Sequence, residues 1–215
     1  MGNYLRSLPQ FEVTADSATD AVLDNGQNAT FLHHTVLKLR RPDRFRADVT
    51  GSGQDRGLVY DGRHFTIFNL GDGYYSTNPA PNTINGLAQV LNSTYDIETP
   101  LADLFYWGIG KNDDVVLTSA QLIGLERVDA RRCNHYAYRQ AGLDWQLWLE
   151  DGPRPLPCRL QITDTTQESH PTHEVTYHWN LNVSLPDSAF AFTPSPGAHQ
   201  IVLKPAHAPL LGEAQ

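Results

Sequence analysis

Histidine is the side chain in this sequence that most directly suggests chemistry, because imidazole binds metals and titrates near neutral pH. Nine histidines are present, and the densest group is His170, His173 and His178. On a strand, however, His173 and His178 point to opposite faces, since side chains alternate with a period of two. His170 precedes Pro171 in a segment that is typical of a turn. We therefore expect no metal site.

A histidine can also act as a general base, and His135 is the main candidate for that role. No serine or cysteine can be placed beside it from the sequence. His33 and His34 are neighbours that point apart on a strand and cannot act together. The common signatures of nucleophilic, nucleotide-binding and zinc-dependent enzymes are also missing. A structural histidine is the favoured interpretation, and we expect neither an enzyme nor a cofactor.

The sequence has two cysteines, Cys133 and Cys158, without metal-ligand spacing. If Cys133, Trp145 and Cys158 lie on three consecutive antiparallel strands, the cysteines are on next-but-one strands, about 9 to 10 Å apart. A disulfide requires Cα atoms within about 7 Å of each other. We therefore predict two free thiols and no disulfide. A bulge or a different strand order would reverse this prediction.

The large aromatic residues allow two interpretations. They are concentrated in a central segment with helical spacing and in the strands, and they comprise Trp107, Trp145, Trp148 and Trp179, with Phe65, Phe68, Tyr136 and Tyr138. In the first interpretation they fill the core, where aromatic side chains contribute strongly to burial. In the second, some of them line a cavity against a curved sheet. Periodicity does not separate the two, and both stay open.

Composition restricts the partners of the chain. The formal net charge is -8 and the pI is about 5.5, which argues against binding to nucleic acid or to an anionic membrane surface. No run of residues reaches the roughly 20 apolar residues of a membrane-spanning helix. The first residues lack the apolar core of a signal peptide, and a leader could have been removed beforehand. The residues themselves therefore leave the compartment open.

Alternating apolar and polar residues predict the strands that position the histidine, cysteine and aromatic side chains described above. Val175, Tyr177 and Trp179, for example, share one face, whereas Glu174 and Thr176 share the other. Such alternation indicates an antiparallel sheet with one wet side. With the turn signals between them, we expect strands near residues 11–24, 27–41, 44–50, 56–60, 63–69, 74–78, 121–139, 143–150, 156–165, 173–182 and 199–203.

The middle of the chain has helical spacing. Ile84, Leu87, Ala88, Leu91 and Tyr95 fall on one helical stripe. A short helix is expected over residues 101–105, with Thr99 as its cap and Pro100 at its first position. A further helical turn, capped by Asp113-Asp114, is expected through Leu117. These helices are expected to cover the sheet as a lid over a hollow. We expect a single domain over residues 1–204 and a mobile tail over residues 205–215.

Several segments, taken in order, resemble a family of predicted periplasmic proteins of unknown function related to the lipoprotein carriers LolA and LolB. The resembling segments are Arg41-Pro42-Asp43-Arg44-Phe45-Arg46, Tyr60-Asp61-Gly62 with the strand at residues 65–69, residues 96–104, residues 133–138, Trp145-Gln146-Leu147-Trp148, Pro155-Leu156-Pro157 and residues 190–198. The resemblance extends from about Tyr4 to Leu203.

The resemblance implies a mainly β fold with a few short helices (α+β), namely an unclosed antiparallel half-barrel of about eleven strands with helices as a lid. It also implies a periplasmic location and a cavity that in the carriers takes lipoprotein acyl chains. Arg41 matches an arginine that helps to hold the lid shut, which makes it the lid-latch candidate. The cavity candidates are Phe45, Phe65, Ile67, Leu87, Leu91, Leu104, Trp107, Tyr136, Trp145, Trp148 and Trp179.

Three functions are compatible with these observations. The leading hypothesis is a non-enzymatic periplasmic carrier that holds a lipid or a lipoprotein acyl chain between the concave sheet face and the lid. The alternative is an envelope structural or protein-interaction module whose core is filled and which takes no cargo. The third is a hydrolase that uses His135 or a histidine near His173, and it requires a nucleophile within hydrogen-bonding reach.

Overall fold

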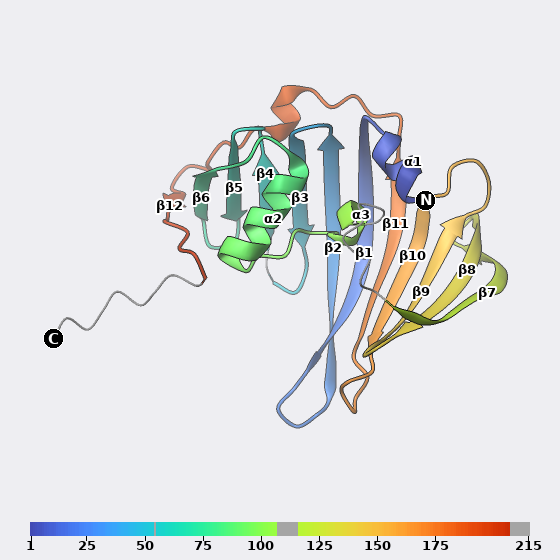
Figure 1. The fold of residues 1–215 in the computed structure, drawn as a ribbon. Coiled ribbons are helices and arrows are strands. Elements are labelled where there is room, and N and C mark those ends of the chain that lie inside the picture. The colour runs from blue at the N-terminus through green and yellow to red at the C-terminus, as the bar shows by residue number, and fades with distance from the viewer. Residues whose placement is uncertain (54, 107–115, 207–215) are drawn as a thin grey trace.

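The computed structural model describes residues 1–53, 55–106 and 116–206. Within them, most of the chain is β-strand, with a few short helices (Figure 1). The strands are β1 (Gln10–Val22), β2 (Asn28–Arg40), β3 (Arg44–Thr50), β4 (Arg56–Tyr60), β5 (His64–Asn69), β6 (Tyr74–Pro79), β7 (Leu117–Val128), β8 (Arg131–Gln140), β9 (Leu143–Glu150), β10 (Pro157–Asp164), β11 (Thr172–Asn180) and β12 (His199–Gln200). The helices are α1 (Gly2–Ser7), α2 (Ile84–Tyr95), α3 (Asp103–Tyr106) and the 3₁₀ helix η1 (Asp187–Phe190).

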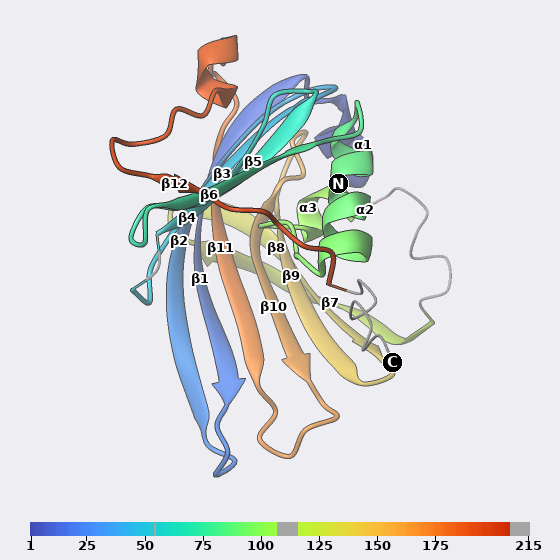
Figure 2. The same cartoon turned by 90° about the vertical axis from the view of Figure 1, so that its left-hand side faces the viewer.

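The twelve strands form one sheet in the order β12-β6-β5-β4-β3-β2-β1-β11-β10-β9-β8-β7. Neighbouring strands are antiparallel, except that β12 runs parallel to β6. Within the described residues the edge strands β12 and β7 do not pair with each other, so the sheet stays open. It curves around the helices in Figure 2. The expected unclosed, mainly antiparallel sheet is confirmed, with twelve strands in place of about eleven.

Strand β1 lies at the centre of the sheet and organises its core. It pairs with β2 on one side and with β11 on the other, so that Val13 lies between Leu37 and Trp179. Val13 and Leu37 are completely buried. The alternation seen in the sequence therefore gives the sheet one apolar face, as expected for a half-wet antiparallel sheet.

The helices lie against this apolar, concave face (Figures 1 and 2). Helix α2 begins after Thr83, whose Oγ1 accepts a hydrogen bond from the N–H of Gly86 at 3.1 Å. It buries its apolar stripe, Ile84, Leu87, Ala88 and Leu91, against the sheet. The expected central helix is confirmed. The short helices α1 and η1 were not expected from the sequence.

Two strand predictions are wrong in their bounds. The single strand expected over residues 121–139 is a hairpin of β7 and β8 that turns at Asp129 and Ala130. Asp129 has a φ of 53°, a conformation that aspartate tolerates better than most residues, and this turn has no glycine to reveal it. The last strand is also shorter than expected, with only residues 199–200 paired.

The prediction of free thiols is also wrong, because Cys133 and Cys158 form a disulfide. They lie on β8 and β10, next-but-one strands as expected, but their Cα atoms are only 6.7 Å apart. The pairing of β10 with β9 shifts register between Pro157 and Arg159, at the position of Cys158. A bulge of this kind bends the strand locally and brings the cysteines together, which regular strand spacing would not do.

The disulfide is expected to stabilise the fold mainly by restricting the unfolded chain. The bridged residues are 25 positions apart. A loop of that size corresponds to roughly 3 to 4 kcal/mol. The double variant Cys133→Ala/Cys158→Ala should therefore lose about that much free energy of unfolding in urea. A reducing agent should destabilise the wild type and leave the variant unchanged; equal sensitivity of the two proteins to reduction would contradict this assignment.

Candidate ligand-binding site

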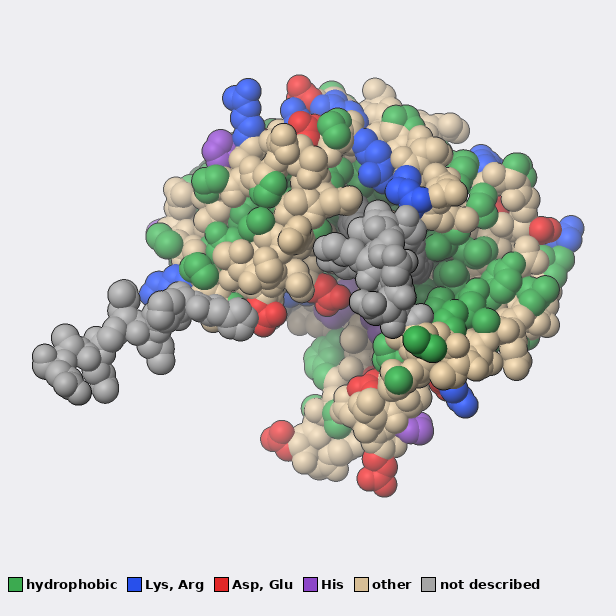
Figure 3. Space-filling view, viewed as in Figure 1, with side chains coloured by type: hydrophobic (Ala, Val, Ile, Leu, Met, Phe, Trp, Pro, Cys, Tyr) green, Lys and Arg blue, Asp and Glu red, His purple; other side chains and the backbone are tan. Residues whose placement is uncertain are grey.

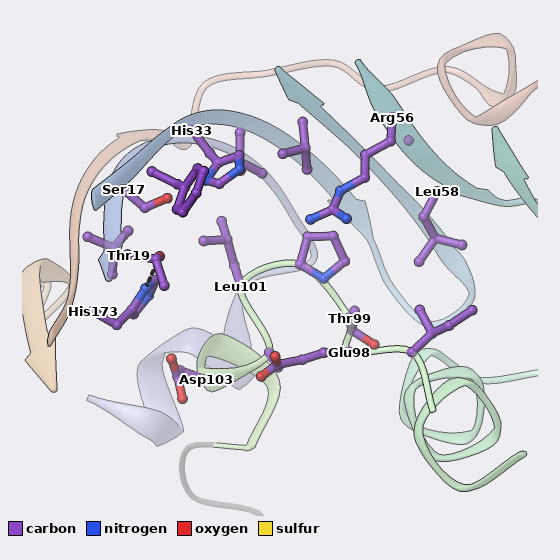
Figure 4. Close-up of a pocket in the computed structure, with 18 of the residues that line it drawn as sticks. Ser17, Thr19, His33, Arg56, Leu58, Glu98, Thr99, Leu101, Asp103 and His173 are labelled. Carbon is purple, nitrogen blue, oxygen red and sulfur yellow. Dashed lines mark hydrogen bonds between the residues drawn. The ribbon is translucent and has the colours of Figure 1, made fainter. Parts of the chain in front are cut away.

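A cavity of about 700 Å³ lies between the concave sheet face and the segment 96–103, which connects α2 to α3 (Figure 4). This volume is within the range of roughly 300 to 1,000 Å³ that is common for small-molecule sites. The sheet side is formed by residues of β1 to β5 and β11, and the other side by every residue from Asp96 to Asp103. The cavity therefore lies beside the part of the sheet that α2 covers.

The sheet wall of the cavity is partly apolar. Its apolar side chains come from facing positions of neighbouring strands, and they are Ala21, Phe31, Val49, Leu58, Ile67, Val175 and Tyr177. Leu58 pairs with Ile67, and Val49 pairs with Thr35, so these side chains form a continuous surface. Such a surface can accept an apolar ligand without a specific polar contact.

The segment 96–103 has an unusual backbone. Asp96 and Leu101 both have positive φ angles, 54° and 55°. A positive φ is costly for a leucine, and residues with this conformation tend to occur where a side chain must be aimed at a site. Leu101 does point into the cavity (Figure 4). This segment therefore places an apolar side chain opposite the sheet wall.

Thr99 in the same segment does not have the expected role. Its hydroxyl does not cap a helix at residue 101, since α3 begins only at Asp103. Thr99 is 5% exposed, and its Oγ1 has no hydrogen-bond partner. Buried polar groups are normally paired, so an unpaired hydroxyl in a cavity wall calls for an explanation.

Polar and ionisable groups occupy another part of the wall. His173 Nδ1 lies 2.8 Å from Thr19 Oγ1. Burial raises the pKa of Asp103, an effect opposed by His173 and increased by Glu98. Burial also raises the pKa of the Tyr177 hydroxyl, with a contribution from the Asp103 carboxylate. The cavity is therefore amphipathic.

The Thr19–His173 pair is what the hydrolase hypothesis requires near His173, a hydroxyl next to an imidazole. Acyl transfer also needs donors aimed at an oxyanion, and these are usually backbone N–H groups. Thr19 and His173 are paired with each other across β1 and β11, where N–H groups serve the sheet. The pair is better suited to holding a polar group of a ligand.

His135 lies on the convex face and forms a closed set of interactions there. Its Nδ1 is 3.1 Å from Glu126 Oε1, and its Nε2 is 2.9 Å from Gln146 Oε1. Its ring stacks on Trp148 at 4.0 Å, and Trp148 Nε1 donates to Glu126. The hydrogen bonds from Trp148 and His135 lower the pKa of Glu126. Both ring nitrogens have side-chain partners, and neither partner is a nucleophilic serine or cysteine, so we interpret this histidine as structural.

The residues proposed as a cavity wall are distributed over several places. Ile67 lines the cavity. Phe45, Phe65, Leu87, Leu91 and Leu104 belong to the buried core between sheet and helices, and Trp145 and Trp179 pack against that core. Tyr136 pairs with Leu147 and shares its concave face. Trp107 lies outside the described residues.

Trp148 differs from the other tryptophans because it belongs to a separate cluster with Val128 and the disulfide, on the convex face. It pairs with His135, whereas Trp145 pairs with Tyr138 on the concave side. The expectation that Trp148 faces the cavity is therefore wrong. Its position three residues after Trp145 already places the two on opposite faces of a strand.

Arg41, the lid-latch candidate, contacts the N-terminal segment. Its Nε donates to the carbonyl of Leu8 at 3.2 Å and its Nη2 to that of Leu5 at 3.4 Å. Burial lowers the pKa of Arg41, with a further contribution from Arg6. These bonds tie α1, rather than α2, to the start of the β2–β3 turn.

The concave face stays apolar beyond the helices. Figure 3 shows hydrophobic side chains gathered over β7, β8 and β9, at the right of the view. Tyr138, Trp145 and Leu149 are partly buried there, and Leu122 and Leu125 are largely exposed. This surface continues the apolar face of the core toward the open edge of the sheet.

The sequence and the fold were each compared with known proteins. The sequence matches the model of a family described as "Predicted periplasmic protein (DUF2092)" over residues 1–204. A search of curated proteins finds no match. An uncharacterised conserved protein from Thermus thermophilus is similar with a TM-score of 0.51 at 10% identity, over 93% of this chain and 94% of that one. This similarity shows the fold alone.

Two further solved structures are more distant. The lipoprotein LppX from Mycobacterium tuberculosis has a TM-score of 0.48 at 12% identity, over 86% of this chain and 93% of that one. A LolA superfamily protein from Nitrosomonas europaea has a TM-score of 0.38 at 14% identity, over 86% of this chain and 91% of that one. None of the helices that the structure describes is both long and apolar enough to cross a membrane.

The raised pKa of Asp103 gives a prediction about stability. Ionisation of Asp103 opposes folding once the pH exceeds the ordinary value of 3.8. Asp103→Asn removes this charge, so the variant should melt at a higher temperature than the wild type at pH 7. The difference should shrink as the pH falls through the folded-state pKa and vanish below 3.8.

Thermal unfolding at several pH values measures this, and Asp24→Asn, at an exposed hairpin position, serves as the control with little effect at any pH. A variant less stable than the wild type at pH 7 would show that the carboxylate stabilises the cavity wall.

Proposed function

Because the chain belongs to the family of predicted periplasmic proteins whose model it matches, we propose that it is a non-enzymatic periplasmic carrier of an apolar cargo. The cargo is a lipid or a lipoprotein acyl chain, held between the concave sheet face and the helices with segment 96–103. The family match confirms the periplasmic location that the resemblance implies. The cargo and the carrier role are our inference from the site.

The cavity of about 700 Å³ is the observation that carries this proposal. Protein cores are close-packed, with few voids larger than a water molecule. The hollow beside the closely packed core around Phe65 and Leu91 is therefore too large to be an ordinary void of such a core, and it is partly open to solvent. Its apolar sheet wall supports an apolar ligand.

Burial of an acyl chain supplies a free-energy gain that grows with the length of the chain. Each buried methylene contributes about 0.8 kcal/mol, so ten methylenes contribute about 8 kcal/mol before the costs of association. Those costs are at least about 4 kcal/mol. The balance for ten methylenes is therefore at most about 4 kcal/mol, a dissociation constant of about 1 mM, and tighter binding requires a longer chain or polar contacts.

The alternative is an interaction module with a filled core, and the core is indeed filled in the part of the molecule under α2. Under α2, side chains of the helix and of the sheet fill the space, and Phe65, Leu87 and Leu91 are nearly inaccessible to solvent. Beyond the end of α2, segment 96–103 faces the sheet across the cavity. The open part favours the carrier over the filled module.

A change at Leu101 tests the carrier proposal. Leu101→Asn replaces an apolar wall residue with a polar one and suits the positive φ, which asparagine tolerates. Loss of this contact should weaken the binding of a fluorescent single-chain fatty-acid probe by roughly ten- to a hundredfold, since burying a leucine side chain contributes about 1.5 to 3 kcal/mol. Fluorescence titration measures the affinity, and thermal unfolding checks the fold.

Leu32→Asn is the matched control. Leu32 is exposed and lies on β2 between Phe31 and His33, both of which line the cavity, so its side chain points to the other face. Its substitution should leave the probe affinity unchanged. Equal affinities for Leu101→Asn and the wild type would place the bound chain elsewhere and contradict the site.

A further inference from the structure

Charged side chains face the cavity from both sides. Arg56 comes from the start of β4, and Glu98 and Asp103 come from segment 96–103. Arg56 and Glu98 are exposed to solvent, and Asp103 is in the electrostatic field of His173. Within the part of the chain that the structure describes, none of the three side chains forms a hydrogen bond or an ion pair. Arginine is nearly always charged in proteins, so Arg56 presents a permanent positive charge.

These charges are separated in space. In Figure 4 the guanidinium of Arg56 reaches into the cavity from the sheet, and the carboxyl groups of Glu98 and Asp103 lie on the opposite side. Glu98 raises the pKa of Asp103, as expected for two neighbouring carboxyl groups. Asp96 lines the same segment and adds a further negative charge. The sheet wall therefore carries a positive charge and the facing segment is acidic.

An uncharged apolar ligand would fit this arrangement poorly. It would displace water from Arg56 and from the carboxylates without replacing their hydrogen bonds, which costs free energy. The buried hydroxyl of Thr99 would also remain unpaired. A purely anionic ligand would bind Arg56 but would be repelled by the carboxylates of segment 96–103. A purely cationic ligand would be repelled by Arg56.

We propose that the cavity selects an amphiphile with one acyl chain and a zwitterionic head group, whose acidic group binds Arg56 and whose ammonium group binds Glu98 and Asp103. This inference rests on the proposed carrier function and specifies its cargo. The acyl chain lies along the apolar wall that includes Leu58 and Ile67. The cavity of about 700 Å³ is within the range of small-molecule sites, and we assign one acyl chain to it.

Three ligands with the same acyl chain separate the contributions of the phosphate and ammonium groups to binding. Lysophosphatidylethanolamine carries a phosphate and an ammonium group, lysophosphatidylglycerol carries the phosphate alone, and monoacylglycerol is uncharged. In competition titrations against a fluorescent acyl probe, below the concentration at which micelles form, the first should bind roughly tenfold or more tightly than the other two, since charged hydrogen bonds are strong.

Charge-removing variants assign each half of the head group. Arg56→Gln should weaken both phospholipids by roughly tenfold and leave monoacylglycerol unchanged. The double variant Glu98→Gln/Asp103→Asn should bring lysophosphatidylethanolamine down to the affinity of lysophosphatidylglycerol. Arg63→Gln and Glu168→Gln make the same changes at exposed positions outside the cavity and should change none of the affinities.

The outcomes distinguish this inference from the function on which it rests. Equal binding of the three ligands, unaffected by Arg56→Gln, would leave the carrier in place and overturn head-group selection. Preference for lysophosphatidylglycerol would overturn the role of the ammonium group. Failure of all three ligands and of the probe to bind folded protein would overturn the carrier function itself.

Discussion

The pairing of β1 with both β2 and β11 is the interaction on which the rest of the structure depends. On one side of β1 lie the strands β2, β3, β4, β5, β6 and β12, and on the other side lie β11, β10, β9, β8 and β7. The two pairings of β1 join them in a single sheet whose concave face is apolar. The sheet is open and curved, so this face is longer than the short helices that lie against it (Figure 2). Helix α2 buries one part of the face. Where α2 ends, segment 96–103 faces the sheet, and the cavity results.

The polar side chains on the two faces of the sheet differ in their hydrogen bonding. On the convex face His135, Glu126 and Gln146 satisfy one another beside Trp148 and the disulfide, and a satisfied network of this kind makes the structure rigid. On the concave side, the exposed side chain of Arg56 and the buried hydroxyl of Thr99 have no partner in the described structure. Buried atoms without a partner also occur at Asn28, Arg159 and Ser169, so it is their place in the cavity wall that leads us to interpret Arg56 and Thr99 as binding groups for a ligand.

Much of this architecture could be predicted from the sequence, because alternation and helical spacing report burial directly. The strand at residues 44–50 and the helix at residues 84–95 follow from such patterns. The hairpin at Asp129 and the disulfide could not, since a positive φ at aspartate and a bulge at Cys158 leave no periodic signal. The polar cavity lining was also missed, although Ser17 and Thr19 share the face of Val13, because small polar residues on a strand do not by themselves distinguish a cavity wall from a solvent-exposed face.

We infer that this cavity holds an apolar cargo in the cell. Native mass spectrometry of the protein purified from a bacterial periplasm, before and after mild organic extraction, is a direct test. We expect an adduct of lipid mass that extraction removes, and we expect the extracted protein to take up a lipid of the same class when it is supplied. A bare mass before extraction, together with no uptake of acyl-chain probes by the folded protein, would contradict it.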